Sequence, residues 1–242
     1  MVGMELGTVL GIWAHPDDEA YLSGGLMSLA RGAGSRVVCV TATRGELGTP
    51  DPETWPPERL AAARTVELAR CLGILGVTEH RWLDYADGAC AEAAVDKAVE
   101  RVCDLIDEVR PDTVVTFGPD GFTGHADHRA VSGWATTAFA KAAGRDARLL
   151  YAAAPQRRTR RWGELYSRLS VFEEGYPVWV PDSALALDLR LDRRTVTRKV
   201  RALAAQTTQT ADLIGMLGVE TYTAWVAEES FVAASGPAVD CR

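Results

Sequence analysis

Three short apolar runs constrain the fold of this chain more than any other feature of its sequence. They occupy residues 8–13, 36–41 and 113–117, and none of them alternates between apolar and polar positions. Continuous apolar runs of this length are typical of strands that are buried on both faces of a parallel sheet. Segments with helical spacing separate them. The sequence therefore predicts an α/β fold, a Rossmann-like, mostly parallel sheet with helices on both faces.

Further elements follow from the same patterns along the rest of the chain. Glycine or proline marks the end of several of the expected helices. The sequence has no internal repeat, low-complexity tract or linker-like change in composition, which favours a single domain over residues 1–242. We expect helices at about 20–30, 58–72, 91–109, 130–142 and 193–217, and strands at about 81–85, 149–153 and 185–189.

The overall composition argues against several classes of partner. Hydrophobic residues make up 47% of the chain and charged residues 24%, and the net charge is -7. A chain with this charge is not expected to bind nucleic acid or anionic lipid through a broad electrostatic surface. The one basic run, residues 157–161, is short, and we interpret it as a solvated helix face or a local anion contact.

The cysteines and the start of the chain indicate a cellular compartment. The scatter of the cysteines, without a C-x-x-C pair, is typical of reduced thiols rather than of a disulfide framework. Residues 1–5 lack the pattern of a signal peptide, and no apolar run approaches the ~20 residues that span a bilayer. We therefore expect a cytoplasmic protein without a membrane span. The cysteines are Cys39, Cys71, Cys90, Cys103 and Cys241.

A dense group of imidazole and carboxyl side chains follows the first apolar run. Residues 14–19 read Ala-His-Pro-Asp-Asp-Glu and lie at the expected carboxyl end of that strand, where α/β sheets bind ligands. The three acids, Asp17, Asp18 and Glu19, could simply stabilise the start of a helix through its dipole. That account leaves His15 unexplained. Taken alone, the segment leaves a helix cap and a metal site open.

A second group follows the run at residues 113–117. A glycine-rich loop leads into His125-Ala126-Asp127-His128, which holds two of the four histidines of the chain. His125 and His128 are three residues apart and can share one face of a helical turn. Both groups are expected at the same edge of the sheet. A catalytic zinc site uses three protein ligands and leaves a position for water, and a nearby carboxylate can act as general base.

These residues resemble the motifs of a known family. A-H-P-D-D-E at 14–19 and H-x-D-H at 125–128 are similar to those of the LmbE/PIG-L-type zinc-dependent de-N-acetylases, which remove acetyl groups from N-acetylglucosamine-containing molecules. Residues 43–48, Thr-Arg-Gly-Glu-Leu-Gly, resemble the family's T-x-G-E-x-G stretch. Residues 64–73 and 87–88 resemble its R-x-x-E helix and its D-G step. The resemblance covers about residues 8–131.

The resemblance implies a metal site and a general base at the matching positions. His15, Asp18 and His128 would ligate one Zn²⁺ per chain. Asp17 would take a proton from the attacking water and would later protonate the departing amine.

The resemblance also implies roles for residues around the metal. His125 would stabilise the oxyanion, held cationic and oriented by Asp127. Arg64 and Asp87 would contact the sugar or its substituent, and the planar guanidinium suits hydroxyls or an anionic group. A buried ion pair between helix and loop accounts for these last two residues equally well.

The chain departs from the family pattern at several positions. Ala126 stands where the family usually has proline, and Thr123 stands where some members have tyrosine. Residues 206–209 read Gln-Thr-Thr-Gln where the family often shows H-x-S-Q, so Gln206 replaces an imidazole and could alter the choice of substrate. Residues 229–231 are a short and weak match to the family's terminal E-x-F.

The resemblance implies a hydrolase that removes an N-acyl group, most simply acetyl, from an N-acetylglucosamine-containing small molecule. The near alternative is an amidase acting on a thiol-sugar conjugate or an N-acylated antibiotic, because pocket loops decide the substrate. Alternatives of other classes are an inert metal- or sugar-binding module and a two-metal phosphoesterase that uses Asp120. Aromatic residues at 154–181 could stack on sugars or acyl chains, or could form core or homo-oligomer contacts.

Overall fold

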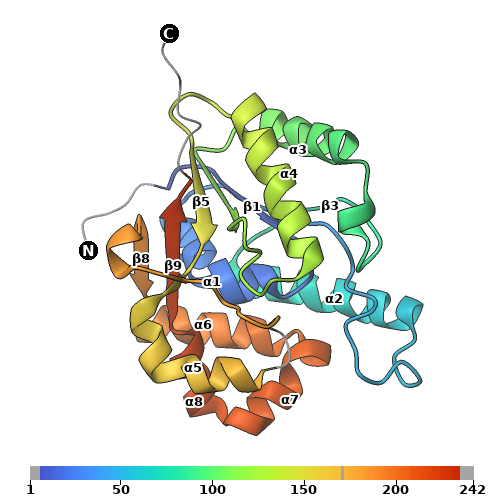
Figure 1. Cartoon of the computed structure of the whole chain (residues 1–242), viewed down its shortest axis with the longest axis vertical. Helices are drawn as coiled ribbons and strands as arrows, with labels where there is room; N and C mark the ends of the chain where they lie inside the picture. Colours follow the sequence, from blue (N-terminus) through green and yellow to red (C-terminus); the bar gives the residue numbers. More distant parts are fainter. Residues whose placement is uncertain (1–5, 170–171, 235–242) are drawn as a thin grey trace.

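A seven-stranded sheet forms the centre of the structure, a computed structural model that describes residues 6–169 and 172–234. Its strands are β1 (Val9–Trp13), β2 (Val37–Thr41), β3 (Glu79–Trp82), β4 (Thr113–Phe117), β5 (Arg148–Ala152), β8 (Leu187–Arg190) and β9 (Glu228–Ala233). They lie in the order β3-β2-β1-β4-β5-β9-β8 (Figure 1). The first five pair in parallel, whereas β9 is antiparallel to both β5 and β8. The predicted mostly parallel sheet is confirmed.

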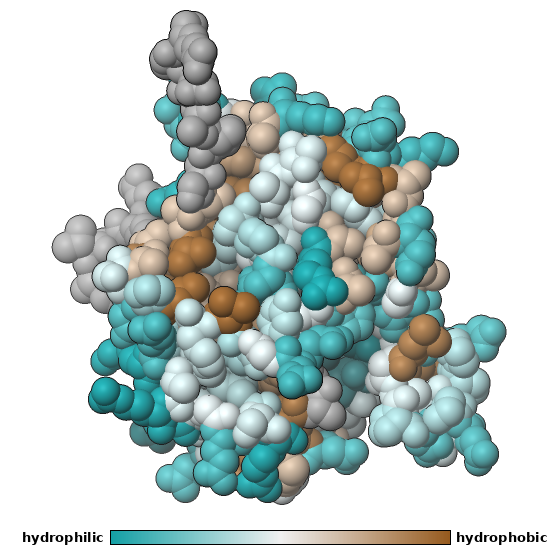
Figure 2. Space-filling model, in the orientation of Figure 1, coloured by the Kyte–Doolittle hydropathy of each residue, from teal (hydrophilic) through white to brown (hydrophobic). Residues whose placement is uncertain are grey.

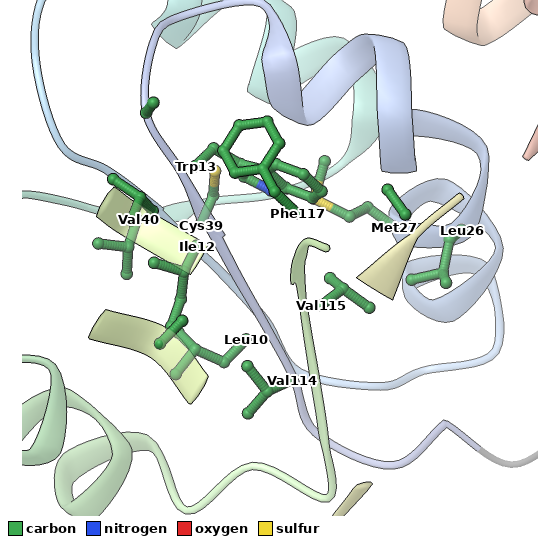
Figure 3. Packing of buried hydrophobic residues seen from close by; sticks show 14 of the residues in the cluster. Leu10, Ile12, Trp13, Leu26, Met27, Cys39, Val40, Val114, Val115 and Phe117 are labelled. Atoms are coloured by element: carbon green, nitrogen blue, oxygen red, sulfur yellow. The ribbon is translucent and has the colours of Figure 1, made fainter. Parts of the chain in front are cut away.

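The centre of the sheet is buried because its strands carry apolar side chains on both faces. Every residue of β1, β2 and β4 is buried. Side chains alternate between the two faces of a strand, so Leu10 and Ile12 point to one side of the sheet and Trp13 points to the other (Figure 3). The Trp13 ring meets that of Phe117 edge to face, with centroids 5.0 Å apart. β1 and β4 therefore form the core of the molecule.

Helices cover both faces of the sheet, as predicted (Figure 1). Those of the described chain are α1 (Asp18–Gly32), α2 (Pro57–Leu75), α3 (Val95–Val109), α4 (Ala126–Ala142), α5 (Thr159–Arg168), α6 (Arg193–Ala204), α7 (Thr207–Leu217) and α8 (Val219–Val226). α3 packs against α4 on one face, and α6 packs against α1 and α2 on the other. A small second sheet joins β6 (Ala154–Pro155) to β7 (Trp179–Val180), and 3-10 turns lie at η1 (Cys90–Glu92), η2 (Gln156–Arg158) and η3 (Asp182–Ala184).

The strand order places a ligand-binding crevice between β1 and β4. The chain passes from β1 to β2 on one side, while β4 lies on the other side of β1. In open α/β sheets, ligands bind beyond the carboxyl ends of the strands at the point where the strand order reverses. β1 ends at Trp13, just before the first group of histidine and carboxylates, and β4 ends at Phe117, from which a loop leads to the second group at His125. The topology thus brings the two sequence motifs to one edge of the sheet.

Several element boundaries differ from the prediction. α4 begins at Ala126, four residues before the expected start, and β3 lies at Glu79–Trp82 rather than at 81–85. The helix expected at 91–109 is the turn η1 followed by α3. The sequence patterns predicted neither β9 nor the helices α5 and α8.

The long helix expected at residues 193–217 is two helices, α6 and α7, so this prediction is wrong. The break lies at Gln206, whose φ of -94° and ψ of 57° are not helical. Its side chain turns inward, where Nε2 donates to Oε1 of Glu19 at 2.7 Å. Glu67 caps the new helix by accepting from the backbone N–H and the hydroxyl of Thr208, at 3.0 and 2.7 Å. Hydrogen bonds to α1 and α2 thus replace a helical continuation.

A buried ion pair holds β9 in place. Lys199 and Glu229 are both buried, and Nζ donates to Oε1 at 2.7 Å. The Glu229 carboxylate also accepts from the backbone N–H groups of Gly25 and Leu26, at 2.6 and 2.7 Å. A Cβ at Gly25 would lie 2.5 Å from a methyl carbon of Leu191 and 3.0 Å from Oε1 of Glu229, so a larger residue would displace the Leu191 side chain and crowd the carboxylate. The weak E-x-F match therefore marks the place where β9 meets α1 and α6.

The basic run at residues 157–161 is only partly the solvated face that we predicted. Its last two arginines are exposed. Arg157 instead forms ion pairs with carboxylates of the protein itself. Arg158 is buried, and it donates to the carbonyl oxygen of Trp225 at 2.6 Å. Two arginines of the run therefore belong to internal contacts.

The thiols and the surface agree with an ordinary globular protein. Four cysteines are free, as predicted, while Cys241 and residues 1–5 lie outside the described residues. No helix in the described part of the chain is long and apolar enough to cross a membrane. On the face shown in Figure 2, hydrophobic side chains form small, separate groups among hydrophilic ones. A homo-oligomer stays a prediction.

His80 on β3 makes the stability of the fold depend on pH. Burial, followed by the charges of Arg44 and Arg81, lowers the pKa of its imidazole to about 4. Between pH 6.5 and 4 the unfolded chain therefore binds a proton that the folded chain does not, and acid favours unfolding. We expect this group to lower the free energy of unfolding by about 2 to 3 kcal/mol as the pH falls through that range. Chemical denaturation of His80→Gln at several pH values should give a flatter profile than wild type. Parallel profiles would contradict the assignment.

Candidate metal centre and substrate cavity

The turn between β1 and α1 holds Asp17 in an unusual conformation. Its φ of 110° lies in the left-handed region that favours glycine. The Asp17 N–H donates to Oε2 of the buried Glu19 at 2.9 Å, and the Asp17 carbonyl oxygen accepts from the N–H groups of Ala20 and Tyr21, both at 2.9 Å. Strain that the surroundings hold in this way is concentrated at functional sites. The sequence left open whether Glu19 only stabilises the start of a helix. In the structure, its carboxylate holds the backbone of Asp17.

His15, Asp18 and His128, the three predicted zinc ligands, lie together. Nδ1 of His15 is 3.0 Å from Nε2 of His128. One oxygen of Asp18 lies 3.6 Å from the first nitrogen, and its other oxygen lies 3.4 Å from the second. Ligand atoms placed tetrahedrally around zinc at 2.0–2.1 Å are roughly 3.3 Å apart. The spacing of these donor atoms therefore fits a zinc ion.

Hydrogen bonds on the far side of each imidazole define which nitrogen carries the proton. Nε2 of His15 lies 3.0 Å from Asp87 and 3.2 Å from Asp127, so it donates to these carboxylates. Nδ1 of His128 donates to the carbonyl oxygen of Gly121 at 3.0 Å. If both rings are neutral, the lone pairs of the remaining nitrogens, Nδ1 of His15 and Nε2 of His128, face each other. This arrangement is favourable only when a shared proton or a metal ion lies between the two nitrogens. The chemistry of the donor set thus also fits a metal.

The neighbouring carboxyls of Asp17 and Asp18 have different pKa values because the charges around them differ. Burial raises the pKa of Asp17 to about 7, against the opposing effect of the Arg64 guanidinium. Burial acts in the same direction on Asp18, but His128 and His15 outweigh it and lower the pKa of that carboxyl to about 2. Asp18 therefore stays ionised, as a metal ligand must. Asp17 titrates near neutral pH, which suits a group that takes up and releases a proton.

Asp127 and His125 are arranged differently from our prediction. The Asp127 carboxylate accepts from His15, and from the backbone N–H groups of Gly88 and Cys90 at 2.8 and 3.0 Å. The backbone N–H of Asp127 donates to Nδ1 of His125 at 3.2 Å. This contact leaves Nε2 as the ring nitrogen that can donate to a ligand. The Asp127 carboxylate therefore does not orient His125, contrary to our prediction, because its partners are His15 and the two backbone N–H groups.

Arg64 reaches the same turn from α2. Its side chain is buried, and one terminal nitrogen donates to the Gly45 carbonyl oxygen at 2.8 Å. The other donates to the Pro16 carbonyl oxygen and lies 3.5 Å from Asp17. A Cβ at Gly45, where φ is 64°, would lie 2.1 Å from this guanidinium, which explains the glycine of the T-x-G-E-x-G stretch. The contacts seen are thus those of a buried ion pair with Asp17, while Asp87 contacts His15 instead.

A cavity of about 800 Å³ opens beside the cluster. All of the predicted site residues line it except Asp127, which is fully buried. A cavity of this volume can enclose a small molecule. Of the aromatic residues at 154–181, Tyr166 and Phe172 line it. An apolar part of the wall comes from α1, α5, α7 and α8, through Tyr21, Leu22, Tyr166, Leu213, Trp225 and Val226.

Gln206 and Gln209 occupy different places. Gln209 lines the cavity, whereas Gln206 is 1% exposed and lies outside its wall. The Gln206 side chain donates to Glu19, which accepts from the Asp17 N–H in turn. The glutamine that replaces the imidazole therefore contacts Glu19, the residue that holds the Asp17 backbone in place.

Several residues of the cavity went unnoticed in the sequence. Tyr21 and Leu22 follow the first motif by one helical turn, and helical periodicity from Asp17 could have placed them beside it. Arg158 and Trp225 lie in the C-terminal half, and no spacing connects them to either motif.

The fold and the site together define an α/β protein with a candidate metal centre at the carboxyl ends of β1 and β4. The family model described as PIG-L: GlcNAc-PI de-N-acetylase matches residues 10–139. The chain belongs to this family, as the resemblance predicted.

Individual relatives agree with this assignment. A 1D-myo-inositol 2-acetamido-2-deoxy-alpha-D-glucopyranoside deacetylase from Kineococcus radiotolerans is 36% identical over 164 residues, which cover 56% of this chain and 45% of the relative. A protein with the same description from Acidothermus cellulolyticus is 33% identical over 238 residues, 84% of this chain and 80% of the relative. The chain spans about half the length of several curated relatives that it matches.

A solved structure supports the fold. The N,N'-diacetylchitobiose deacetylase from Pyrococcus horikoshii superposes with a TM-score of 0.68 at 20% identity, covering 97% of this chain and 88% of that chain.

Proposed function

We propose that this chain is a zinc-dependent hydrolase that removes an N-acyl group, most simply acetyl, from an N-acetylglucosamine-containing small molecule. The observation that carries the proposal is the cluster of His15, Asp18 and His128, with the Asp17 carboxyl in the same turn. The facing imidazole nitrogens lie 3.0 Å apart, and one Asp18 oxygen lies 3.6 Å from the first while the other lies 3.4 Å from the second. The names of the relatives, which specify deacetylation of a 2-acetamido-2-deoxyglucoside of inositol, support the substrate class. An amino-sugar conjugate is thus the proposed partner, and a cytoplasmic location stays a prediction.

His15, Asp18 and His128 would hold the zinc ion, one per chain. When bound there, zinc supplies an activated water and polarises the amide carbonyl group. Asp87 and Asp127 accept from the far nitrogen of His15, and this keeps its Nδ1 aimed at the metal.

Asp17 would move the proton. Its carboxylate accepts a proton from water as the water oxygen bonds to the amide carbon. The carboxyl then gives this proton to the nitrogen as the carbon–nitrogen bond breaks, releasing an amine and a carboxylic acid, which loses its own proton to solvent. A pKa of about 7 suits both transfers. Arg64, 3.5 Å away, holds the Asp17 carboxylate in position.

His125 would stabilise the charge that develops on the amide oxygen. Its Nδ1 is occupied by the Asp127 N–H, so the hydrogen on Nε2 is the one available to a ligand. A hydrogen-bond donor stabilises an oxyanion when it is held in place before the reaction. The position of His125 at the N-terminal end of α4, on the cavity wall, provides that placement.

The other readings of the sequence are less well supported. An amidase for a thiol-sugar conjugate or an N-acylated antibiotic would use the same groups, and only the occupant of the apolar wall would differ. The additional carboxylate of a two-metal phosphoesterase, Asp120, is not among the described residues that line the cavity. An inert binding module would not need the strained backbone of Asp17.

Metal removal and an amine-release assay test the proposal. We expect purified protein to contain about one zinc per chain and to release amine from N-acetylglucosaminyl-inositol. Dialysis against a chelator should abolish turnover, and added zinc should restore it, because the attacking water depends on the metal. N-acetylglucosaminyl-malate, -lipid and glycopeptide substrates would rank the conjugates. Full activity in metal-free protein, or no amine from any of these substrates, would refute the proposed function.

A further inference from the structure

The wall of the cavity contains a buried arginine with few partners. Arg158 lies at the end of η2, is 9% exposed and lines the cavity. In the part of the chain that the structure describes, its one hydrogen bond is the 2.6 Å contact with the Trp225 carbonyl oxygen. Its Nε is buried and has no partner. A buried cation is costly unless an acceptor or an anion faces it.

The neighbouring carboxylates do not neutralise this cation directly. Glu228, which shares the cavity wall, lies 3.3 Å from Arg157. Glu229 is buried and pairs with Lys199 at 2.7 Å. Glu173 and Glu174 are exposed. Arg158 is therefore left as a cation on the wall without a carboxylate of its own among the described residues.

Trp225 also lines the cavity and is 8% exposed, and its carbonyl oxygen accepts from one terminal nitrogen of Arg158. The indole Nε1 of Trp225 and the Nε of Arg158 are closed off from the cavity. The terminal nitrogens of the Arg158 guanidinium are therefore the donors that a ligand in the cavity can reach.

These donors are connected to the proposed catalytic residues along the cavity wall. Tyr21 follows Asp17 by one turn of α1, and its N–H donates to the Asp17 carbonyl oxygen at 2.9 Å. The ring of Tyr21 lies 5.8 Å from that of Trp225, centroid to centroid. A sugar whose acetamido group lies at the metal cluster would therefore direct a substituent along Tyr21 towards Arg158.

We infer that the Arg158 guanidinium binds an anionic group, a carboxylate or a phosphate, on the substituent of the amino sugar. The inference rests on the proposed function for the reacting end of the substrate. A guanidinium presents a planar set of donors that matches both anions, and hydrogen bonds to a charged group are the strong ones. The site thus selects anionic N-acetylglucosaminides over neutral ones.

The test measures kcat/KM of the zinc-loaded full chain for three substrates. They are methyl N-acetylglucosaminide, which is neutral, N-acetylglucosaminyl-malate, which carries carboxylates, and N-acetylglucosamine 1-phosphate. We expect wild type to show a higher kcat/KM for at least one anionic substrate than for the neutral one. Whichever anion is preferred identifies the group that is bound. Equal values for all three would overturn the inference.

Substitutions test whether Arg158 causes the preference for anionic substrates. Arg158→Met should lower the ratio of anionic to neutral kcat/KM by about 10- to 100-fold, mainly through KM, because it removes hydrogen bonds to a charged group. Arg158→Lys, which keeps the charge, should restore part of the ratio. Arg160→Met, on the exposed face of α5, is the matched control and should leave the ratio unchanged. An Arg158→Met variant that keeps the wild-type ratio would refute the assignment.

A binding measurement separates this inference from the proposed function. Calorimetry with glucosamine 1-phosphate and methyl glucosaminide reports on the anion site without any turnover. Tighter binding of the phosphate that Arg158→Met abolishes supports the site even if no substrate is hydrolysed. Equal binding of the two ligands to wild type refutes the site even if all three substrates are deacetylated. The same measurement decides the case if Arg158→Met does not fold, because wild type alone suffices.

Discussion

Asp17→Asn should retain zinc and lose most of its turnover. Asparagine tolerates the left-handed backbone of this position nearly as well as aspartate does, so the turn should keep its shape. The amide cannot take up the proton of the attacking water, and loss of a general acid–base group lowers kcat by about 10²- to 10⁴-fold. Steady-state kinetics together with zinc analysis of the same preparation measure both quantities.

A second aspartate provides a matched control for this substitution. Asp84 also has a positive φ, 54°, but it lies on the surface and pairs with Arg44 at 2.7 Å. Asp84→Asn should therefore leave kcat and zinc content unchanged. If Asp17→Asn instead loses zinc and regains full turnover after reloading, Asp17 supports the metal and is not the base.

The half of the fold around β1, β2 and β4 was predictable because its signals are local. Each of these strands is a continuous apolar run that is buried on both faces, and the following motif lies at its carboxyl end. A parallel sheet then brings the ends of β1 and β4 together. For this reason the histidines and carboxylates of the site could be named before their distances were known.

What the sequence did not predict depends on contacts between distant segments. β9 pairs with β5 and β8 and is fixed by Glu229, whose partners are Lys199 and the backbone of α1. The break at Gln206 exists because its side chain bonds to Glu19, 187 residues away along the chain. Neither contact leaves a periodic pattern, and helical periodicity alone continues through residue 206.

The error at Asp127 has a similar origin. A motif gives the spacing of Asp127 and His125 but not the direction of either side chain. The carboxylate points to His15 because the N–H groups of Gly88 and Cys90 complete its hydrogen bonds there. The D-G step and the H-x-D-H motif thus act together on His15, one of the proposed metal ligands, although 37 residues separate Cys90 from Asp127.

His128→Ala should lose zinc. It leaves His15 and Asp18 as the only two of the proposed ligands, whereas catalytic zinc sites use three protein ligands. Removal of residues that merely support a ligand already costs 10- to 100-fold in metal affinity, so we expect the loss of a ligand to weaken binding by more than about 100-fold. Competition with a chromogenic chelator measures the affinity, and turnover should fall with zinc content.

The remaining histidines make this prediction specific. His80→Gln alters an imidazole on β3 that bonds to the Thr41 hydroxyl, outside the cavity, and should keep zinc and activity. His125 is the harder comparison, because its ring nitrogen lies within reach of those of His15 and His128 and could serve as a third ligand by distance alone. Since its Nδ1 is occupied by the Asp127 N–H, we expect His125→Ala to keep zinc and to lose turnover. If His128→Ala retains zinc and His125→Ala loses it, the two roles are exchanged. His125 is then the metal ligand, and His128, whose ring stacks on Phe117, is the oxyanion donor.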